Sequence, residues 1–192
     1  MCIRDRYISS LRDDDQSYGR MVNNVYQFLI GLNSEYPGFG SWYWNSVEPS
    51  LIEGTKEIII AEWKRKIIGV SIIKKDFEEK KICTLRVDKT FRGNGVGKKL
   101  IQFSLMELET DLPFISVSSQ RIRQFEKTFR YFGFQLEEKN HNYYKSGYDE
   151  YCYNGFLPGS FYDPEYGKMV MKMPGLPLTA GLGVRGLELI HE

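Results

Sequence analysis

Cysteine is scarce in this chain of 192 residues, and its three cysteines, Cys2, Cys83 and Cys152, are scattered. An odd number without paired spacing predicts neither a disulfide framework nor a Cys-x-x-Cys metal site, and it favours a reducing, cytoplasmic compartment. Long apolar runs are also missing: none reaches the length of a membrane span, and the first residues lack the apolar core of a signal peptide. We therefore expect no membrane partner, and we assign residues 1–6 no function.

The sequence also has no large excess of charge of either sign. The 26 basic and 25 acidic residues leave a formal net charge of +1, so no bulk field favours nucleic acid as a partner. The two histidines, His141 and His191, are isolated, without metal-ligand spacing, and we expect no metal site. With 42% hydrophobic and 27% charged residues, the composition is that of an ordinary globular domain.

The most informative stretch is Phe91–Leu100, with the sequence Phe-Arg-Gly-Asn-Gly-Val-Gly-Lys-Lys-Leu. It follows a strand-like run at 81–87 and leads into an amphipathic helical pattern. A glycine-rich turn at a helix N-terminus presents unpaired backbone N–H groups and the positive end of the helix dipole, which suit a phosphate. Arg92 adds a guanidinium whose fork matches phosphate oxygens. We predict a pyrophosphate-binding loop here.

The spacing of the glycines distinguishes between the known kinds of phosphate-binding loop. A dinucleotide fingerprint would need glycine where Lys98 or Leu100 stands, and a P-loop would need a hydroxyl residue at Lys99. Both patterns therefore fail. The pattern that remains is Arg92-x-x-Gly95-x-Gly97.

This pattern resembles motif A of the GCN5-related N-acetyltransferases (GNAT), whose loop binds the pyrophosphate of acetyl-CoA. The segment Phe129–Phe134 is similar to the family's Tyr-x-x-x-Gly-Phe segment. The resemblance implies an α/β fold with a central mixed, mostly antiparallel sheet flanked by helices. It also implies an enzyme that transfers an acetyl group from acetyl-CoA to an amine by direct attack in a ternary complex.

The order of predicted elements agrees with that fold over residues 1–157. We expect strands at 7–11, 57–63, 66–73, 82–87 and 114–117, and a final strand pair at 134–145 and 149–153. Helices are expected after Asp13, after the glycine-rich loop and at 121–131, the last ending at Gly133. Residues 34–49 are predicted to be turn-rich. Residues 158–192 hold six glycines and four prolines, and we expect a loosely ordered extension there.

The resemblance implies roles for residues of this chain. Backbone groups of Leu85, Arg86 and Val87 would bind the pantetheine arm alongside the strand, and an N–H near Val87 would polarise the thioester oxygen. The residues implied to hold the pyrophosphate are Arg92, Gly93, Asn94, Gly95, Val96, Gly97 and Lys98.

The residues that would act as general acid and general base are less clearly indicated by the sequence. Phe129 stands where much of the family has a proton-donating tyrosine, which leaves Tyr131, or Tyr143 and Tyr144 from the last strands, as donors to the departing thiolate. The candidate bases are four glutamates that also suit an exposed surface: Glu57, Glu62, Glu78 and Glu79.

The acceptor site is predicted in the aromatic segment before the second strand. Trp42, Tyr43 and Trp44 would form a wall around an amine or cap one end of the core. A small-molecule or peptide amine is the expected acceptor. A non-catalytic acetyl-CoA-binding module, an enzyme acting on a protein or charged tRNA, and a homodimer all remain open.

Overall fold

The structure is a computed structural model that describes residues 4–158, 161–163 and 168–170. The chain divides into two compact units, Met1–Gly155 and Phe156–Glu192. The second unit contains an antiparallel pair of short strands, β8 (Phe161–Asp163) and β9 (Lys168–Val170). Most of the predicted extension at 158–192 lies outside the described residues.

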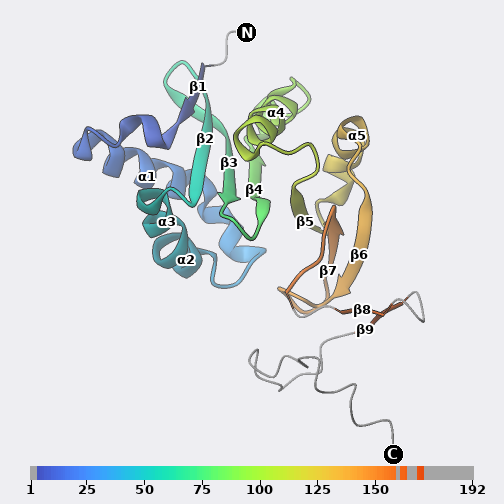
Figure 1. Cartoon of the computed structure of the whole chain (residues 1–192). Helices are drawn as coiled ribbons and strands as arrows, with labels where there is room; N and C mark the ends of the chain where they lie inside the picture. The colour runs from blue at the N-terminus through green and yellow to red at the C-terminus, as the bar shows by residue number, and fades with distance from the viewer. Residues whose placement is uncertain (1–3, 159–160, 164–167, 171–192) are drawn as a thin grey trace, which may run out of the picture. The chain divides into compact units, whose positions relative to one another are not determined.

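The first unit is built on one sheet, with the strand order β1-β2-β3-β4-β5-β7-β6 (Figure 1). Its strands are β1 (Arg4–Tyr7), β2 (Lys56–Trp63), β3 (Lys66–Lys75), β4 (Lys80–Val87), β5 (Phe114–Ser118), β6 (Leu136–His141) and β7 (Asp149–Tyr153). Only the β4–β5 pair is parallel in this sheet, and all other neighbours are antiparallel. The predicted fold class, a mixed and mostly antiparallel sheet flanked by helices, is confirmed.

Helices cover the two faces of the sheet (Figure 1). The longer ones are α1 (Asp15–Leu29), α4 (Val96–Leu108) and α5 (Ile122–Phe132). The shorter ones are η1 (Ile8–Leu11), η2 (Ile30–Ser34), α2 (Phe39–Trp42), η3 (Tyr43–Val47), α3 (Glu48–Glu53) and η4 (Lys89–Phe91). The helices α1 to α3 bury one face of β2 and β3, whereas α4 and α5 lie on the opposite face of the sheet.

Local sequence explains where the long helices begin and end. The Asp14 carboxylate accepts a hydrogen bond from the Ser17 N–H at 3.1 Å and caps α1. Gly95 precedes α4 in a left-handed conformation, and Gly133 ends α5 in the same way. The predicted cap at Asp13–Ser17 and the predicted stop at Gly133 are both confirmed.

The N-terminal strand differs from the prediction. The strand expected at 7–11 ends at Tyr7, and Ile8–Leu11 forms a 3-10 helix that buries Ile8. Residues 4–7 instead pair with β2, from Arg4 opposite Glu62 to Tyr7 opposite Ile59. Arg6 also forms an ion pair with Glu62 at 3.4 Å. Part of the segment 1–6, which was assigned no function, therefore belongs to a strand at the edge of the sheet.

The segment predicted to be turn-rich forms turns only at residues 35–38, and from Phe39 onward it is helical, so the prediction was wrong for most of its length. Phe39, Tyr43, Val47 and Leu51 are buried and recur every four residues, which places them on one helical face. The wider turns of the π-helix at Tyr43–Val47 maintain this spacing. This face packs against β2 and β3.

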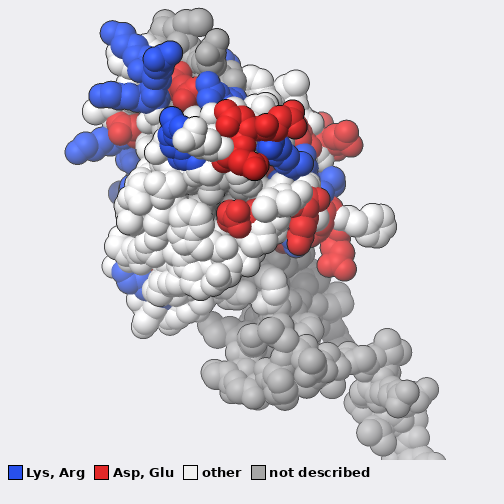
Figure 2. Space-filling model, turned by 90° about the vertical axis from the view of Figure 1, so that its left-hand side faces the viewer, with Lys and Arg blue, Asp and Glu red and all other residues white. Residues whose placement is uncertain are grey.

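Charged residues of both signs mix on the surface seen from the side of the N-terminal helices, and a broad uncharged area lies beside them (Figure 2). In the part of the chain that the structure describes, no helix has the length and apolarity needed to cross a bilayer.

Candidate active site

The glycine-rich loop has the predicted shape. Gly93 and Gly95 have φ angles of 79° and 80°, and a Cβ atom at either position would meet nothing within 4 Å. The space above the loop is therefore open, and side chains there would fill it. The first helical hydrogen bond of α4 runs from the Lys99 N–H to the Gly95 carbonyl at 3.0 Å. The N–H groups that precede Lys99 in α4 thus remain available for an anion, so the loop fits a pyrophosphate.

The side chain of Arg92, just before Gly93, is held by a hydrogen bond to β4. Its Nε donates a hydrogen bond to the Val87 carbonyl at 3.2 Å. Within the described residues its guanidinium makes no other hydrogen bond, so it can meet phosphate oxygens. Strand β4 therefore positions the cation that the sequence predicted.

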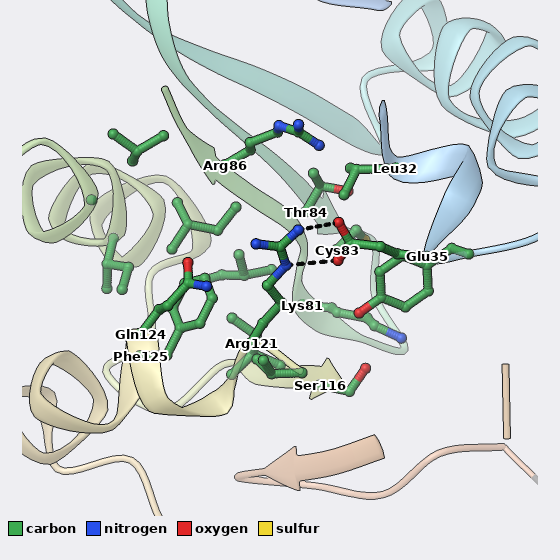
Figure 3. Close-up of a pocket in the computed structure, with 18 of the residues that line it drawn as sticks. Leu32, Glu35, Lys81, Cys83, Thr84, Arg86, Ser116, Arg121, Gln124 and Phe125 are labelled. Atoms are coloured by element: carbon green, nitrogen blue, oxygen red, sulfur yellow. Dashed lines mark hydrogen bonds and ion pairs between the residues drawn. The ribbon is translucent and has the colours of Figure 1, made fainter. Parts of the chain in front are cut away.

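Strands β4 and β5 pair at only two described positions, Lys81 with Phe114 and Ile82 with Ile115. Beyond these pairs the two strands separate, which leaves one edge of β4 without a β5 partner up to Val87. A cavity of about 970 Å³ opens along this edge, from the glycine-rich loop to β7 (Figure 3). Such an edge can accept an extended ligand as an added strand.

Most of the predicted cofactor residues line this cavity. They are Leu85, Arg86, Val87, Arg92, Gly93, Gly95, Gly97 and Lys98. The other two do not line it. Val96, the first residue of α4, is buried in the core between this helix and the sheet. The Asn94 side chain is exposed, and its Nδ2 lies 3.5 Å from the Arg92 carbonyl oxygen. These two can contribute only their backbone to the loop.

An ion pair frames the middle of the cavity. The Arg121 guanidinium, at the beginning of α5, binds both oxygens of Glu35, and its Nε lies 2.8 Å from Oε2 (Figure 3). Hydrogen bonding by Arg121 lowers the pKa of Glu35 below its ordinary value. Arg86 lies beside this pair against Gly31, where a Cβ would be 3.0 Å from its Nη2. Glycine at position 31 is what allows this close approach.

At the β7 end the cavity is lined by Glu150, a residue that the sequence analysis missed. Glu150 is 3% exposed, and within the described residues its Oε1 has no hydrogen-bond partner. Burial raises the pKa of Glu150 to about 7, against the lowering effects of a hydrogen bond with Ser116 and of the Lys81 charge. A carboxyl group with a pKa near neutrality is suited to accept a proton.

Two tyrosines accompany Glu150. The rings of Tyr36 and Tyr144 meet edge to face with centroids 5.4 Å apart, and both line the cavity. Burial raises the pKa of both hydroxyls, and the Glu150 charge acts in the same direction. Both hydroxyls therefore stay protonated at neutral pH.

Most of the other predicted catalytic residues lie outside the cavity. Tyr131 is 62% exposed on α5, under the Lys98 ammonium at 3.4 Å from the ring centroid, and it is not among the residues that line the cavity. Glu57 accepts hydrogen bonds from the Ser9 and Ile58 N–H groups, and Glu62 pairs with Arg6. Of the four glutamates that were candidate bases, Glu79 alone lines the cavity, where it binds Lys74 at 3.0 Å.

The predicted aromatic wall is divided. Trp42 lines the cavity, whereas Tyr43 is fully buried and donates a hydrogen bond to the Val22 carbonyl at 2.8 Å. Trp44 is 38% exposed; its ring is tilted against Tyr26 and meets Tyr43 edge to face. Tyr43 therefore belongs to the core, and of these three residues Trp42 is the one that lines the cavity.

Comparison with known proteins identifies the family. The sequence profile of the Acetyltransferase (GNAT) domain matches residues 41–149, which is more than half of the chain. The chain belongs to the GNAT acetyltransferase family. It is therefore an enzyme of the acetyltransferase class, and the alternative of a non-catalytic module is set aside.

Solved structures of this family share the fold. A GNAT acetyltransferase from Bacillus cereus is 19% identical, with a TM-score of 0.57 over 80% of this chain and 96% of that one. A GNAT-family protein from Desulfovibrio desulfuricans is 18% identical, with a TM-score of 0.55 over 79% of this chain and 97% of the other. Comparison with curated protein sequences gives no match.

Proposed function

We propose that this GNAT enzyme is an acetyl-CoA-dependent N-acetyltransferase that acts on a small-molecule or peptide amine by direct attack in a ternary complex. The observation that carries the proposal is the single cavity that joins the glycine-rich loop, the unpartnered edge of β4 and Glu150. A donor bound at one end and an amine bound at the other would meet along β4.

The donor site is assigned to the loop and the strand. Arg92, Lys98 and the N–H groups from Gly93 to Lys98 would hold the pyrophosphate, and the backbone of Leu85–Val87 would hold the pantetheine arm. Acetyl-CoA, when bound, supplies the acetyl thioester. A β4 N–H in this stretch would donate to the thioester oxygen, where negative charge develops during attack.

The amine is assigned to Glu150. In the reaction the amine nitrogen forms a bond to the acetyl carbon, the bond from that carbon to sulfur breaks, and Glu150 takes the proton that the amine loses. The thiolate then takes a proton from a tyrosine. Tyr144 lines the cavity and is favoured over Tyr131, which does not.

Calorimetric titration with acetyl-CoA tests the donor site. We expect saturable binding by the wild-type protein and none by Gly95→Asp, whose carboxylate would occupy the phosphate position. Gly54→Asp is the matched control, because Gly54 also has a positive φ, 82°, with nothing within 4 Å of its Cβ position. Equal binding by the wild type and Gly95→Asp, or no binding by a folded wild-type protein, would refute the proposal.

A further inference from the structure

Three lysines form a row across the sheet at the acceptor end of the cavity. Lys56 on β2 lies opposite Lys74 on β3, and Lys74 lies opposite Lys81 on β4. Cross-strand partners project from the same face of a sheet, and all three side chains line the cavity. Lys81 is among the labelled residues that line the cavity in Figure 3.

This row is distant from the glycine-rich loop. Lys81 lies near the beginning of β4, whereas the loop follows Val87 at its end. Six residues of extended strand span about 20 Å. The lysine row is therefore too far away to serve the pyrophosphate, and its charge is available to the other substrate.

The positive charge of the row is only partly balanced. Lys74 binds Asp76 at 2.9 Å and Glu79 at 3.0 Å, and Lys81 lies 3.8 Å from Glu79. Within the described residues, Lys56 Nζ has no carboxylate within 4 Å, although its side chain is buried. Its partners are the Ser46 and Ser50 hydroxyls, at 3.1 and 3.0 Å, and the Ser46 carbonyl.

The thiol between these lysines supplies no compensating charge. The charges of both Lys81 and Lys56 act on Cys83, which lines the cavity. Burial nevertheless raises the pKa of this thiol to about 11, so it is neutral at physiological pH. A ligand that carries negative charge would offset the desolvation of Lys56.

We propose that the acceptor amine also carries an anionic group, a carboxylate or a phosphate, that binds between Lys81 and Ser46. This inference rests on the proposed function and names the substrate class. The Ser46 hydroxyl accepts a hydrogen bond from Lys56, so its own proton can be donated to the anion. Lys81 provides the charge-assisted contact, with Lys56 behind the serine.

The same geometry limits the size of the acceptor. The Lys81 charge acts on Glu150, so the anion site and the proposed base are neighbours. The amine would lie at Glu150 between Tyr36 and Tyr144, with the anion one short spacer away. A compact molecule in which few atoms separate amine and anion, as in an amino acid or a phosphorylated aminoalcohol, meets both requirements.

The test compares matched acceptors by thiol release from acetyl-CoA. The panel contains α-, β- and γ-amino acids with their amides, and O-phosphoethanolamine with ethanolamine. The enzymes are the wild type, Lys81→Met, which keeps the apolar stem, and Lys80→Met, a control on an exposed neighbouring position that does not line the cavity. Circular dichroism verifies that each variant is folded.

We expect the wild type to prefer the anionic member of at least one pair by about tenfold or more in kcat/KM, the scale of one charge-assisted hydrogen bond. Lys81→Met should reduce that preference about tenfold and leave the KM for acetyl-CoA unchanged. Lys80→Met should retain the wild-type preference. The amino acid and phosphate pairs distinguish a carboxylate from a phosphate.

The inference is overturned if neutral acceptors are used as well as anionic ones, or if Lys81→Met retains the preference. In either case acetyl-CoA binding and turnover of an amine would persist, and the proposed function would stand. Absence of thiol release with every amine would refute the anionic-acceptor class. If acetyl-CoA binding were absent too, the proposed function would fail with it.

Discussion

Arg121 and Glu35 form a bidentate ion pair that ties the segment before α2 to the beginning of α5, across the middle of the cavity. The Glu35 side chain is 11% exposed and that of Arg121 is 35% exposed, so solvent screens the pair only in part. We expect Arg121→Gln to lower the free energy of unfolding by about 1 kcal/mol, because it leaves the Glu35 carboxylate with fewer hydrogen bonds. Urea unfolding measures this change.

The effect of Arg121→Gln depends on pH. Since the pair lowers the pKa of Glu35, its contribution is present above the pKa of an unfolded glutamate and is lost as pH falls through the lowered pKa. The loss in Arg121→Gln should therefore be full at neutral pH and disappear in acid. The control, Lys139→Gln, breaks a more exposed pair with Asp149 and should lower the free energy of unfolding less than Arg121→Gln does.

Arg92 offers a test of phosphate binding without a loss of stability. Its guanidinium is exposed, and its one described hydrogen bond is to the Val87 carbonyl. We expect Arg92→Ala to weaken acetyl-CoA binding about tenfold to a hundredfold, as loss of a charge-assisted contact does, with unfolding unchanged within about 0.5 kcal/mol. Lys89→Ala, in η4 just before the loop, is the control. Equal Kd values for these two variants would exclude a specific role for Arg92.

The two tyrosine candidates for the proton donor can be separated by mutation. Tyr144→Phe should lower kcat about tenfold or more, because the hydroxyl that lines the cavity is lost and the ring that packs on Tyr36 is kept. Tyr131→Phe should retain the wild-type rate at every pH, because its exposed ring contacts Lys98 and lies outside the cavity lining. Steady-state rates of thiol release decide between them, and a reversed order would assign the donor to Tyr131.

Stability provides an independent test of the Glu150 carboxyl. The pKa of Glu150 in the folded protein, about 7, lies above that of an unfolded glutamate. The wild-type protein therefore loses free energy of unfolding as the pH rises from the unfolded pKa to the folded one. The glutamine of Glu150→Gln does not titrate. Between pH 4 and pH 8 the free energy of unfolding of this variant should therefore rise by about 3 kcal/mol relative to that of the wild type. The exposed Glu137→Gln on β6 should show no such gain. A parallel pH dependence in the wild type and Glu150→Gln would contradict the raised pKa.

The strand, loop and helix that are assigned to the donor could be predicted because their signals are local. A strand, a turn with glycines at fixed positions and an amphipathic helix follow one another between Lys81 and Leu108, and each is specified by neighbouring residues. Glu150 could not be found in this way. Its burial depends on the register of β5 with β7, which places it opposite Ser118 and on the same face as Ser116.

A weaker signal for Glu150 was present. In β7, Glu150 shares a face with the buried Cys152, and a carboxylate on the buried face of a strand is unusual. The helices at 39–53 were missed for a different reason. Aromatic and turn-forming residues dominate their composition, and the every-fourth-residue spacing of Phe39, Tyr43, Val47 and Leu51 outweighs it.

The most direct test of the account is the pH dependence of kcat for acetyl transfer by the wild type and by Glu150→Gln, followed as thiol release at saturating acetyl-CoA. If Glu150 takes the proton of the attacking amine, the wild-type rate rises with pH through about 7 and then levels off. Glu150→Gln should then lose about a hundredfold or more in kcat, lack this inflection and bind acetyl-CoA as the wild type does. A Glu150→Gln enzyme with the wild-type rate and pH profile would contradict the account.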